Sequence, residues 1–254
     1  MTDDIRFARR AVRHELASRD LVVASVRRVT DAIVRVTLTG DALEGFAADG
    51  PADHVKLVFG SAEAGTRVAR DYTPLRFRPE TPELDIDFVL HAHDGPAAAW
   101  ARSAAPGDTL TVAGPRGSRL VPEGMDGLVL VVDESAFPAA ERWLRLTPPA
   151  VPVTLLADAP DEGVAAYFAD AATGREVDTR VVHEPEEVVA ILDTVPAEGA
   201  FFFLAGEATR LIPLRRHLRR TRGLPREQVQ ASGYWKRGVA GLDHHAPVDP
   251  SDPD

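Results

Sequence analysis

The pattern of apolar residues changes near residue 125, and this change limits the folds open to the chain. Before it, short apolar runs are separated by Gly, Pro and Asp, at residues 21–30, 32–40, 54–60, 84–93 and 108–114. After it, continuous apolar runs at 127–133, 151–158, 178–184 and 200–207 are each followed by an amphipathic helical stretch, with a last strand at 227–235. Such alternation predicts a parallel sheet covered by helices on both faces.

Two domains follow from this change. The first, residues 1–122, reads as short β-strands with a helix from Pro96, which favours a barrel or a sandwich. The second, residues 127–242, reads as a doubly wound α/β domain, and Pro122 to Asp126 form the expected linker. Residues 243–254 hold too few apolar side chains to fold, so we expect a disordered tail.

Composition excludes several kinds of function. The chain has no cysteine, so disulfides, thiolate catalysis and a self-ligated iron–sulfur cluster are excluded. Its formal charge of −10 argues against nucleic acid or an anionic membrane as a partner. No apolar run reaches the roughly 20 residues that span a bilayer, and the first residues lack a secretory signal. We expect a cytoplasmic monomer without membrane insertion.

Arg70, Tyr72 and Thr73 lie on one extended segment and together offer the groups that a flavin dinucleotide needs. An arginine presents a planar fork to a diphosphate, a tyrosine presents a face to the isoalloxazine or the ribityl chain, and the threonine can hydrogen-bond a ring nitrogen. The alternative is an ordinary exposed β-strand.

The helix predicted from Pro96 is a second candidate site for the diphosphate, because a helix N-terminus has free amides and a positive dipole. Gly95, Ala97 and Ala98 are small enough for a phosphate to approach the backbone. His91 could donate to the flavin or its phosphates, or could be an ordinary strand histidine. A plain connection from strand to helix remains the alternative for this segment.

The chain resembles the siderophore-interacting proteins, a family of flavin-dependent ferric-siderophore reductases with a ferredoxin reductase-like fold. Eight blocks carry the resemblance, in the order found in that family: residues 40–46, 53–59, 70–74, 87–101, 106–117, 133–142, 205–211 and 233–238. The resemblance implies an α+β two-domain chain, with an antiparallel Greek-key β-barrel that binds FAD followed by an α/β domain resembling NAD(P)H-binding domains. It adds Asp87 and Trp100 to the expected cofactor-binding residues.

The turn after the first strand of the α/β domain departs from the generic dinucleotide pattern. It carries Asp133, Glu134 and Ser135 instead of a glycine-rich loop, and Val132 replaces a usual glycine. The family has a similar acidic loop, so these residues are expected at the nicotinamide nucleotide, which they would bind lightly. Glu207 is expected either to cap its helix or to touch a ligand. A ferredoxin remains open as an alternative electron donor.

Ferric siderophores are commonly anionic, so a chain of charge −10 needs a local basic pocket to hold one. The family is thought to use basic residues over the flavin, and the matching motifs contain Lys56, Arg116, Lys236 and Arg237. Ordinary solvated surface charge is the alternative for each of them. Of Tyr234 and Trp235, we expect one to cover the flavin and the other to pack the last strand, with Trp235 a candidate cofactor contact.

The expected function is reduction of a ferric siderophore by NAD(P)H through FAD. Flavin suits this task because it accepts a hydride and can release electrons singly, as Fe(III) requires. No side chain need act as acid or base, and no protein metal site is expected. The alternatives are a general NAD(P)H:flavin oxidoreductase with another acceptor and a siderophore or flavin carrier without turnover.

Overall fold

The structure is a computed structural model that describes residues 6–60, 65–90, 95–243 and 245–253. The chain forms two compact units, each described here by itself. The barrel unit contains residues 10–120 and 141–146, and the α/β unit contains the other described residues. The main break, between Leu120 and Val121, lies beside the expected boundary. Residues 6–9 group with the α/β unit and residues 141–146 with the barrel unit, which the sequence pattern does not predict.

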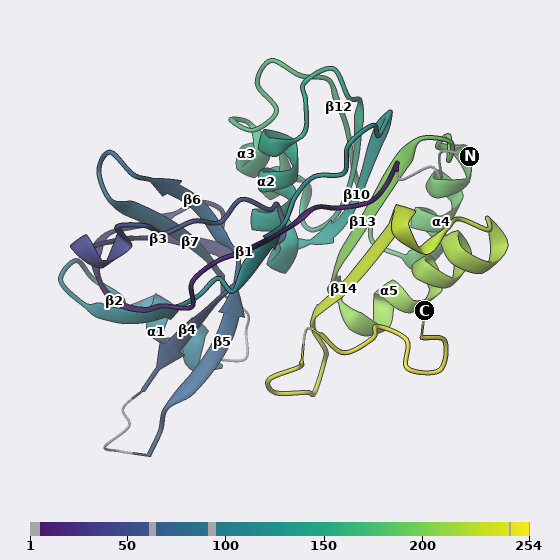
Figure 1. The fold of residues 1–254 in the computed structure, drawn as a ribbon. Helices are drawn as coiled ribbons and strands as arrows, with labels where there is room; N and C mark the ends of the chain where they lie inside the picture. Colours follow the sequence, from purple (N-terminus) through teal and green to yellow (C-terminus); the bar gives the residue numbers. More distant parts are fainter. Residues whose placement is uncertain (1–5, 61–64, 91–94, 244, 254) are drawn as a thin grey trace. The chain divides into compact units, whose positions relative to one another are not determined.

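The barrel unit is built on a seven-stranded antiparallel sheet with the order β5-β4-β8-β2-β3-β7-β6 (Figure 1). Its strands are β2 (Ser18–Arg28), β3 (Ile33–Thr39), β4 (Val55–Phe59), β5 (Val68–Tyr72), β6 (Pro74–Arg78), β7 (Glu83–Val89) and β8 (Thr109–Ala113). A separate short pair joins β1 (Ala11–Arg13) to β9 (Gly117–Arg119). The expected antiparallel barrel-type domain is confirmed.

Alternation along the strands places the core of the barrel unit. In β2, Arg19, Leu21 and Val23 are buried while the residues between them are exposed, as expected for a strand with one face on a core. Helix α1 (Pro96–Ser103) begins at the predicted proline and packs Ala97 and Ala101 into the same core.

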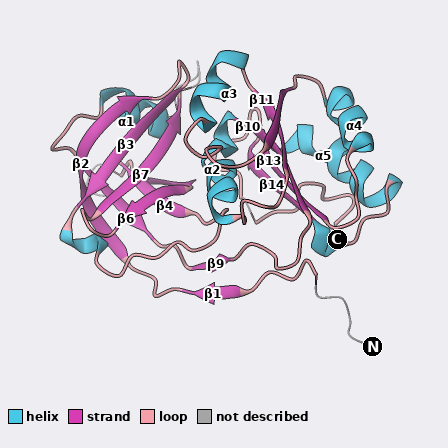
Figure 2. Cartoon of the chain, turned by 90° about the horizontal axis from the view of Figure 1, so that it is seen from above, coloured by secondary structure: helices cyan, strands magenta, loops and turns pink. Residues whose placement is uncertain are grey.

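The α/β unit contains a five-stranded parallel sheet with the order β12-β11-β10-β13-β14. The strands are β10 (Gly127–Asp133), β11 (Val153–Asp158), β12 (Val177–Val181), β13 (Ala200–Glu207) and β14 (Val229–Trp235). All eight residues of β13 are buried, as expected for a central strand covered on both faces. Helix α3 (Asp161–Phe168) lies on one face, and α4 (Pro185–Thr194) and α5 (Ala208–Arg216) lie on the other (Figure 2). The predicted α/β class is confirmed.

Strand order reverses between β10 and β13, and this reversal is where such sheets bind ligands, at the carboxyl ends of the strands. A 3₁₀ turn, Glu134–Ala136, follows β10 and leads into helix α2 (Phe137–Leu146), whose last six residues belong to the barrel unit. Among the described residues, no helix is long and apolar enough to cross a membrane.

Both ends of the described chain pack on the α/β unit. Near the start, the rings of Phe7 and Phe201 lie 6.5 Å apart. Near the end, Asp249 is 3% exposed and accepts from Arg216 Nε at 2.5 Å. Asp252 pairs with Arg215 and Arg220. The carboxylates of the tail thus pair with two arginines of α5 and with Arg220 just beyond it, while the expected disorder of the tail stays a prediction.

Candidate functional site

The Arg70 to Thr73 segment forms the end of β5 and the step into β6. In the ladder with β4, Tyr72 lies opposite Val55 and Arg70 opposite Leu57. The half-buried Arg70 donates from Nη1 to the carbonyl of Ala69 at 2.9 Å, and no carboxylate among the described residues pairs with it. Thr73 is 7% exposed, and none of the described residues hydrogen-bonds its hydroxyl. The Arg70 guanidinium and the Thr73 hydroxyl can therefore still donate hydrogen bonds to a ligand.

Tyr72 belongs to an aromatic cluster inside the barrel unit. Its ring centroid lies 4.7 Å from that of Phe88, which lies 5.5 Å from that of Trp100. Burial raises the pKa of the Tyr72 phenol, and the Arg70 charge opposes the shift only in part, so the phenol stays neutral. Trp100 also contacts Phe59, with centroids 5.8 Å apart, and packs against the core. The cluster fixes the Tyr72 ring beside the Arg70 segment.

None of the described side chains occupies the N-terminus of α1. Gly95, in an extended conformation, is its N-cap, and no side chain caps the helix. A Cβ built on the exposed Gly95 would meet no atom within 4 Å, while Ala97 and Ala98 are buried below. The helix packs on β4 and β7, and β4 pairs with β5. His91 lies outside the described residues.

These donors fit FAD. An arginine and a helix N-terminus that the described residues leave without a carboxylate or a cap are the groups that a diphosphate takes, and the Thr73 hydroxyl suits a flavin heteroatom. Asp87 does not join them. Its carboxylate, 4% exposed, is held by both Nε and Nη2 of Arg35 at 2.7 and 2.8 Å. Asp87 thus forms an internal ion pair with Arg35, and its expected role at the cofactor stays a prediction.

Asp133, at the end of β10, collects four hydrogen bonds. Its Oδ1 accepts from the amide and hydroxyl of Ser135 at 2.9 and 2.5 Å. Its Oδ2 accepts from the amide of Glu207 and from Nε1 of Trp235, both at 2.8 Å. A Cβ on Gly206, which has a φ of +147°, would lie 2.5 Å from Oδ2, so only glycine fits there. Asp133 therefore ties together the ends of β10, β13 and β14.

The three residues of the acidic turn differ in where their side chains are directed, and their expected role at the nucleotide stays a prediction. The carboxylate of Asp133 is turned inward onto protein donors, and burial raises its pKa. The Ser135 hydroxyl and the Trp235 indole each donate a hydrogen bond to the Asp133 carboxylate. The Trp235 indole is therefore anchored within the α/β unit. The Glu134 carboxylate, in the same turn, accepts no hydrogen bond from any of the described residues. Burial, and then the charges of Asp133 and Asp158, raise its pKa.

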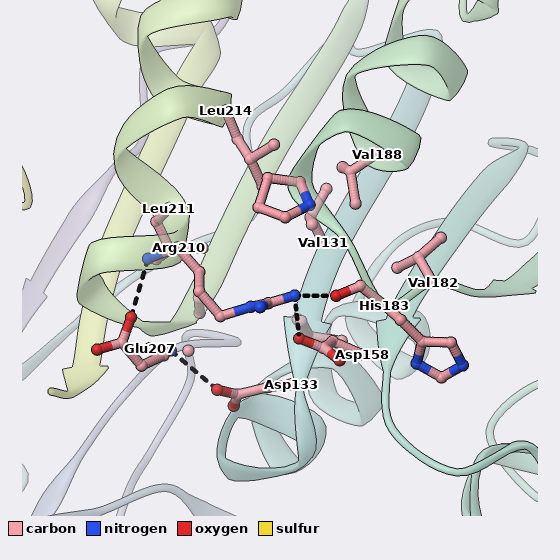
Figure 3. Close-up of a pocket in the computed structure, with 14 residues that line it drawn as sticks. Val131, Asp133, Asp158, Val182, His183, Val188, Glu207, Arg210, Leu211 and Leu214 are labelled. Atoms are coloured by element: carbon pink, nitrogen blue, oxygen red, sulfur yellow. Dashed lines mark hydrogen bonds and ion pairs between the residues drawn. The ribbon is translucent and has the colours of Figure 1, made fainter. Parts of the chain in front are cut away.

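A cavity of about 380 Å³, counting its open mouth, lies at the carboxyl ends of the parallel strands (Figure 3). At its polar side, Arg210 pairs with Asp158 at 3.0 Å and donates to the carbonyl of His183. Glu207 accepts from the Arg210 amide at 2.9 Å, so the expected helix cap is confirmed. The apolar side is lined by Val131, Val182, Val188, Leu211 and Leu214.

Sequence reasoning missed Asp158, His183 and Arg210. Their signal was positional: each lies at or just beyond the carboxyl end of a predicted parallel strand, where ligands bind in such sheets.

The four basic candidates fall into two pairs. Lys56 and Arg116 belong to the barrel unit, and Lys236 and Arg237 belong to the α/β unit. All four are exposed. Lys56 is paired, with Nζ 2.8 and 3.0 Å from the two carboxylate oxygens of Asp71. The backbone amide of Arg237 donates to Glu207 at 3.1 Å, which fixes the chain just beyond β14.

Comparison with known proteins agrees with this division of the chain. A model of the siderophore-interacting FAD-binding domain matches residues 22–69 and 62–119, and a model of the siderophore-interacting protein matches residues 125–238. An NADPH-dependent ferric-chelate reductase of Escherichia coli is 36% identical, over 92% of this chain and 99% of that protein. A ferric vibriobactin reductase of Vibrio cholerae is 29% identical, over 85% and 89%.

Among solved structures, a siderophore utilization protein from T. fusca superposes with a TM-score of 0.81 and 38% identity, over 94% of this chain and all of that one. The matches cover both units and nearly the full length of the relatives. The chain belongs to the siderophore-interacting protein family and carries the FAD-binding domain of that family.

Proposed function

We propose that the chain is an FAD-dependent reductase that passes electrons from NAD(P)H to Fe(III) held by a siderophore. One observation carries the proposal: Arg70, Thr73 and the N-terminus of α1 keep donors that no acceptor among the described residues takes up, inside a family defined by an FAD-binding domain. The names of the similar proteins, a ferric-chelate reductase and a ferric vibriobactin reductase, support the acceptor.

Each group has a task in this proposal. Arg70 and the amides that open α1 hold the diphosphate, Thr73 donates to the flavin ring, and the Tyr72 ring gives a neutral flat surface for it. FAD supplies the conversion of a two-electron hydride into single electrons. The protein's part is to bind and orient, so no side chain is required to move a proton.

The α/β unit is proposed to receive the electron donor in the cavity at the carboxyl ends of its strands. Arg210 is the cation there, although Asp158 already pairs with it. The diphosphate of NAD(P)H would also lie near the Glu134 carboxylate, whose like charge is consistent with weak nucleotide binding. These two carboxylates favour one second candidate, in which a ferredoxin delivers the electrons instead. Because NAD(P)H and ferredoxins are cytoplasmic donors, we assign the protein to the cytoplasm, as a monomer.

Exposed cations of each unit are proposed to attract the ferric siderophore: Lys56 and Arg116 in the barrel unit, and Lys236 and Arg237 in the α/β unit. Their local positive charge would attract an anionic chelate, which the net charge of −10 would otherwise repel.

The test is spectroscopic. The purified chain, mixed with FAD if needed, should show flavin absorbance bands, and these should bleach without oxygen on addition of NADH or NADPH. Bleaching by reduced ferredoxin alone would select the second candidate. Failure to bind FAD under any condition would leave a carrier or binding module and defeat the proposal.

A further inference from the structure

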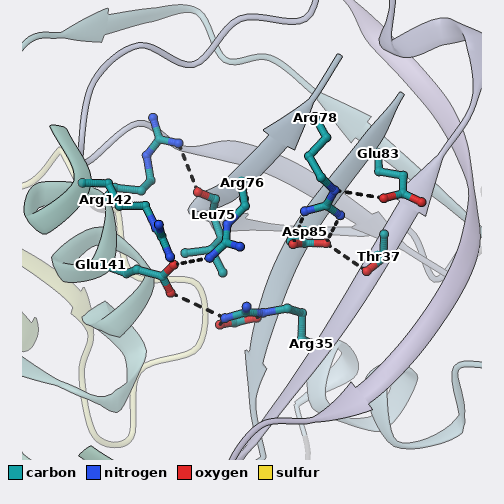
Figure 4. A network of polar contacts seen from close by, with 11 residues as sticks. Arg35, Thr37, Leu75, Arg76, Arg78, Glu83, Asp85, Glu141 and Arg142 are labelled. Carbon is teal, nitrogen blue, oxygen red and sulfur yellow. Dashed lines mark hydrogen bonds and ion pairs between the residues drawn. The ribbon is translucent and has the colours of Figure 1, made fainter. Parts of the chain in front are cut away.

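Arg142, in the part of α2 that belongs to the barrel unit, is only 8% exposed, and no carboxylate among the described residues forms an ion pair with it. Its guanidinium donates to backbone carbonyls from two separate segments, and the one that contains Leu75 is seen in Figure 4. Nη1 donates to Pro74 and Leu75 at 2.9 and 3.3 Å. Nε and Nη2 donate to Gly50 at 3.1 and 2.7 Å, and Nη2 also donates to Ala48 at 2.5 Å. One side chain thus joins the start of β6 to the loop at 48–50.

The β6 end of this clamp lies at a bulge. The register between β6 and β7 shifts between Pro74 and Arg76, so the carbonyls there are not all taken up by the ladder. Arg142 supplies donors to them. Pro74 directly follows Thr73, so the clamp acts one residue beyond the segment that carries Arg70 and Tyr72.

The other end of the clamp is rigid. The Gly50 amide donates to Asp53 at 2.9 Å, and the Ser118 hydroxyl donates to the same carboxylate oxygen at 2.5 Å. Asp53 is 4% exposed. A Cβ on Gly50 would lie 2.5 Å from the Arg119 carbonyl, which shows how tightly the loop is packed. The loop can therefore serve as a fixed support for the bulge.

Arginine is the residue that this geometry requires. Its planar fork reaches acceptors on two segments at once, whereas a lysine ammonium is a single point. Burial lowers the pKa of Arg142, and the charge of Asp53 opposes that shift. The same turn of α2 is joined to β6 by Glu141, which accepts from Arg76 at 2.7 Å; Arg145, one turn further along α2, also donates to Glu141, at 2.9 Å.

We propose that Arg142 is a positioning residue for FAD: by fixing the bulge at Pro74 and Leu75, it holds the Arg70 to Thr73 segment in its binding conformation before the cofactor arrives. A segment ordered in advance loses less conformational freedom on binding, so the clamp raises FAD affinity without touching FAD. The inference rests on the proposed FAD site.

The experiment measures the rate at which FAD leaves the intact holoprotein at 25 °C, from the recovery of flavin fluorescence after dilution. Arg142→Lys is compared with the matched control Arg175→Lys. Burial also lowers the pKa of Arg175, which donates to the backbone carbonyls of Thr147 and Val151 at 3.1 and 2.9 Å. All three residues lie in the α/β unit. Both variants should lose similar thermal stability. Release from Arg142→Lys should be at least about tenfold faster, while Arg175→Lys should match the wild type.

Equal release rates for Arg142→Lys and wild type would overturn the inference, as would an equal acceleration in both variants, which would indicate general loosening. If Arg142→Lys does not fold, Arg142→Gln, which keeps two amide donors, takes its place under the same criteria. A wild type that binds no FAD would instead refute the proposed function, so the two failures are distinguishable.

Discussion

The indole of Trp235, the last residue of β14, donates its Nε1 hydrogen to Oδ2 of Asp133, the last residue of β10, over 2.8 Å. The same oxygen accepts the amide of Glu207 at the end of β13, the strand between them. One carboxylate therefore fixes three parallel strands at the edge where such sheets bind ligands. Asp133, which lies where a glycine-rich loop is usual, therefore stabilises the structure of this sheet edge.

Replacing Asp133 with Asn should destabilise the protein. The Asn amide group would face two donors that the carboxylate accepts, which leaves buried polar groups unpaired at a cost of about 1–3 kcal/mol. Urea unfolding should show this loss in the free energy of unfolding. Trp235→Phe, which removes one donor and keeps the ring, should cost less. An Asn variant as stable as the wild type would show that the hydrogen bonds at Asp133 contribute little.

Glu134→Gln should stabilise the protein at neutral pH. Because burial and neighbouring charges raise the Glu134 pKa, the folded state holds this proton more tightly than the unfolded chain, in which the pKa is about 4.3. The contribution of Glu134 to stability is therefore lost as pH rises from about 4 through the raised pKa. The stability gain of the Gln variant should be present at pH 7 and vanish below pH 4. A gain that is the same at all pH values would contradict this account.

The same substitution should lower the KM for NAD(P)H, since it removes a like charge beside the proposed donor cavity. For the wild type, apparent affinity should improve with salt, which screens charges over about 10 Å at 0.1 M. Stopped-flow bleaching of the flavin measures both effects, with an unchanged flavin spectrum as the control. Slower reduction of the Gln variant would make Glu134 a positive determinant of donor binding.

Arg70→Ala should yield mostly apoprotein. A hydrogen bond to a charged group is worth about 1.5–3 kcal/mol, so FAD affinity should fall by about 10- to 150-fold. The ratio of flavin to protein absorbance measures occupancy, and Arg67→Ala, an exposed neighbour, is the matched control. Full occupancy in the Arg70 variant would remove this residue from the site.

Lys56 offers a paired test of the basic surface. Lys56→Glu should raise the KM for an anionic ferric siderophore, and Asp71→Asn, which releases the Lys56 ammonium from its partner, should lower it by about two- to threefold. Arg237→Glu should act like Lys56→Glu. Flavin content should not change, and a neutral chelate should be unaffected. Equal effects on both chelates would point to a flavin or folding role for these residues.

The sequence was most informative where strands are buried on both faces. The bounds of β10 and β13 match the predicted runs at 127–133 and 200–207, because continuous apolar stretches end where burial ends. The pairing of β1 with β9 was not predicted, because strands of three residues are too short to show a periodic pattern. The ion pairs between the tail and α5 could not be predicted, because such pairs leave no apolar signal in the sequence.

Within the site, residues that act through local geometry were predictable, and residues that act through distant partners were not. The N-terminus of α1 could be read from Gly95 and Pro96 alone. The inward turn of Asp133 depends on donors 74 and 102 residues away, at Glu207 and Trp235. Arg142 likewise acts on a carbonyl 92 residues away, at Gly50, which no local pattern indicates.

The most direct test of the proposed function follows the flavin and the iron in one anaerobic experiment. The holoprotein is first bleached with NAD(P)H and then mixed with a ferric siderophore and a coloured Fe(II) chelator. The account predicts that the flavin bands return as the Fe(II) complex forms, with two Fe(II) for each flavin reoxidised, because Fe(III) takes one electron. A flavin that stays bleached while Fe(III) remains bound would contradict it.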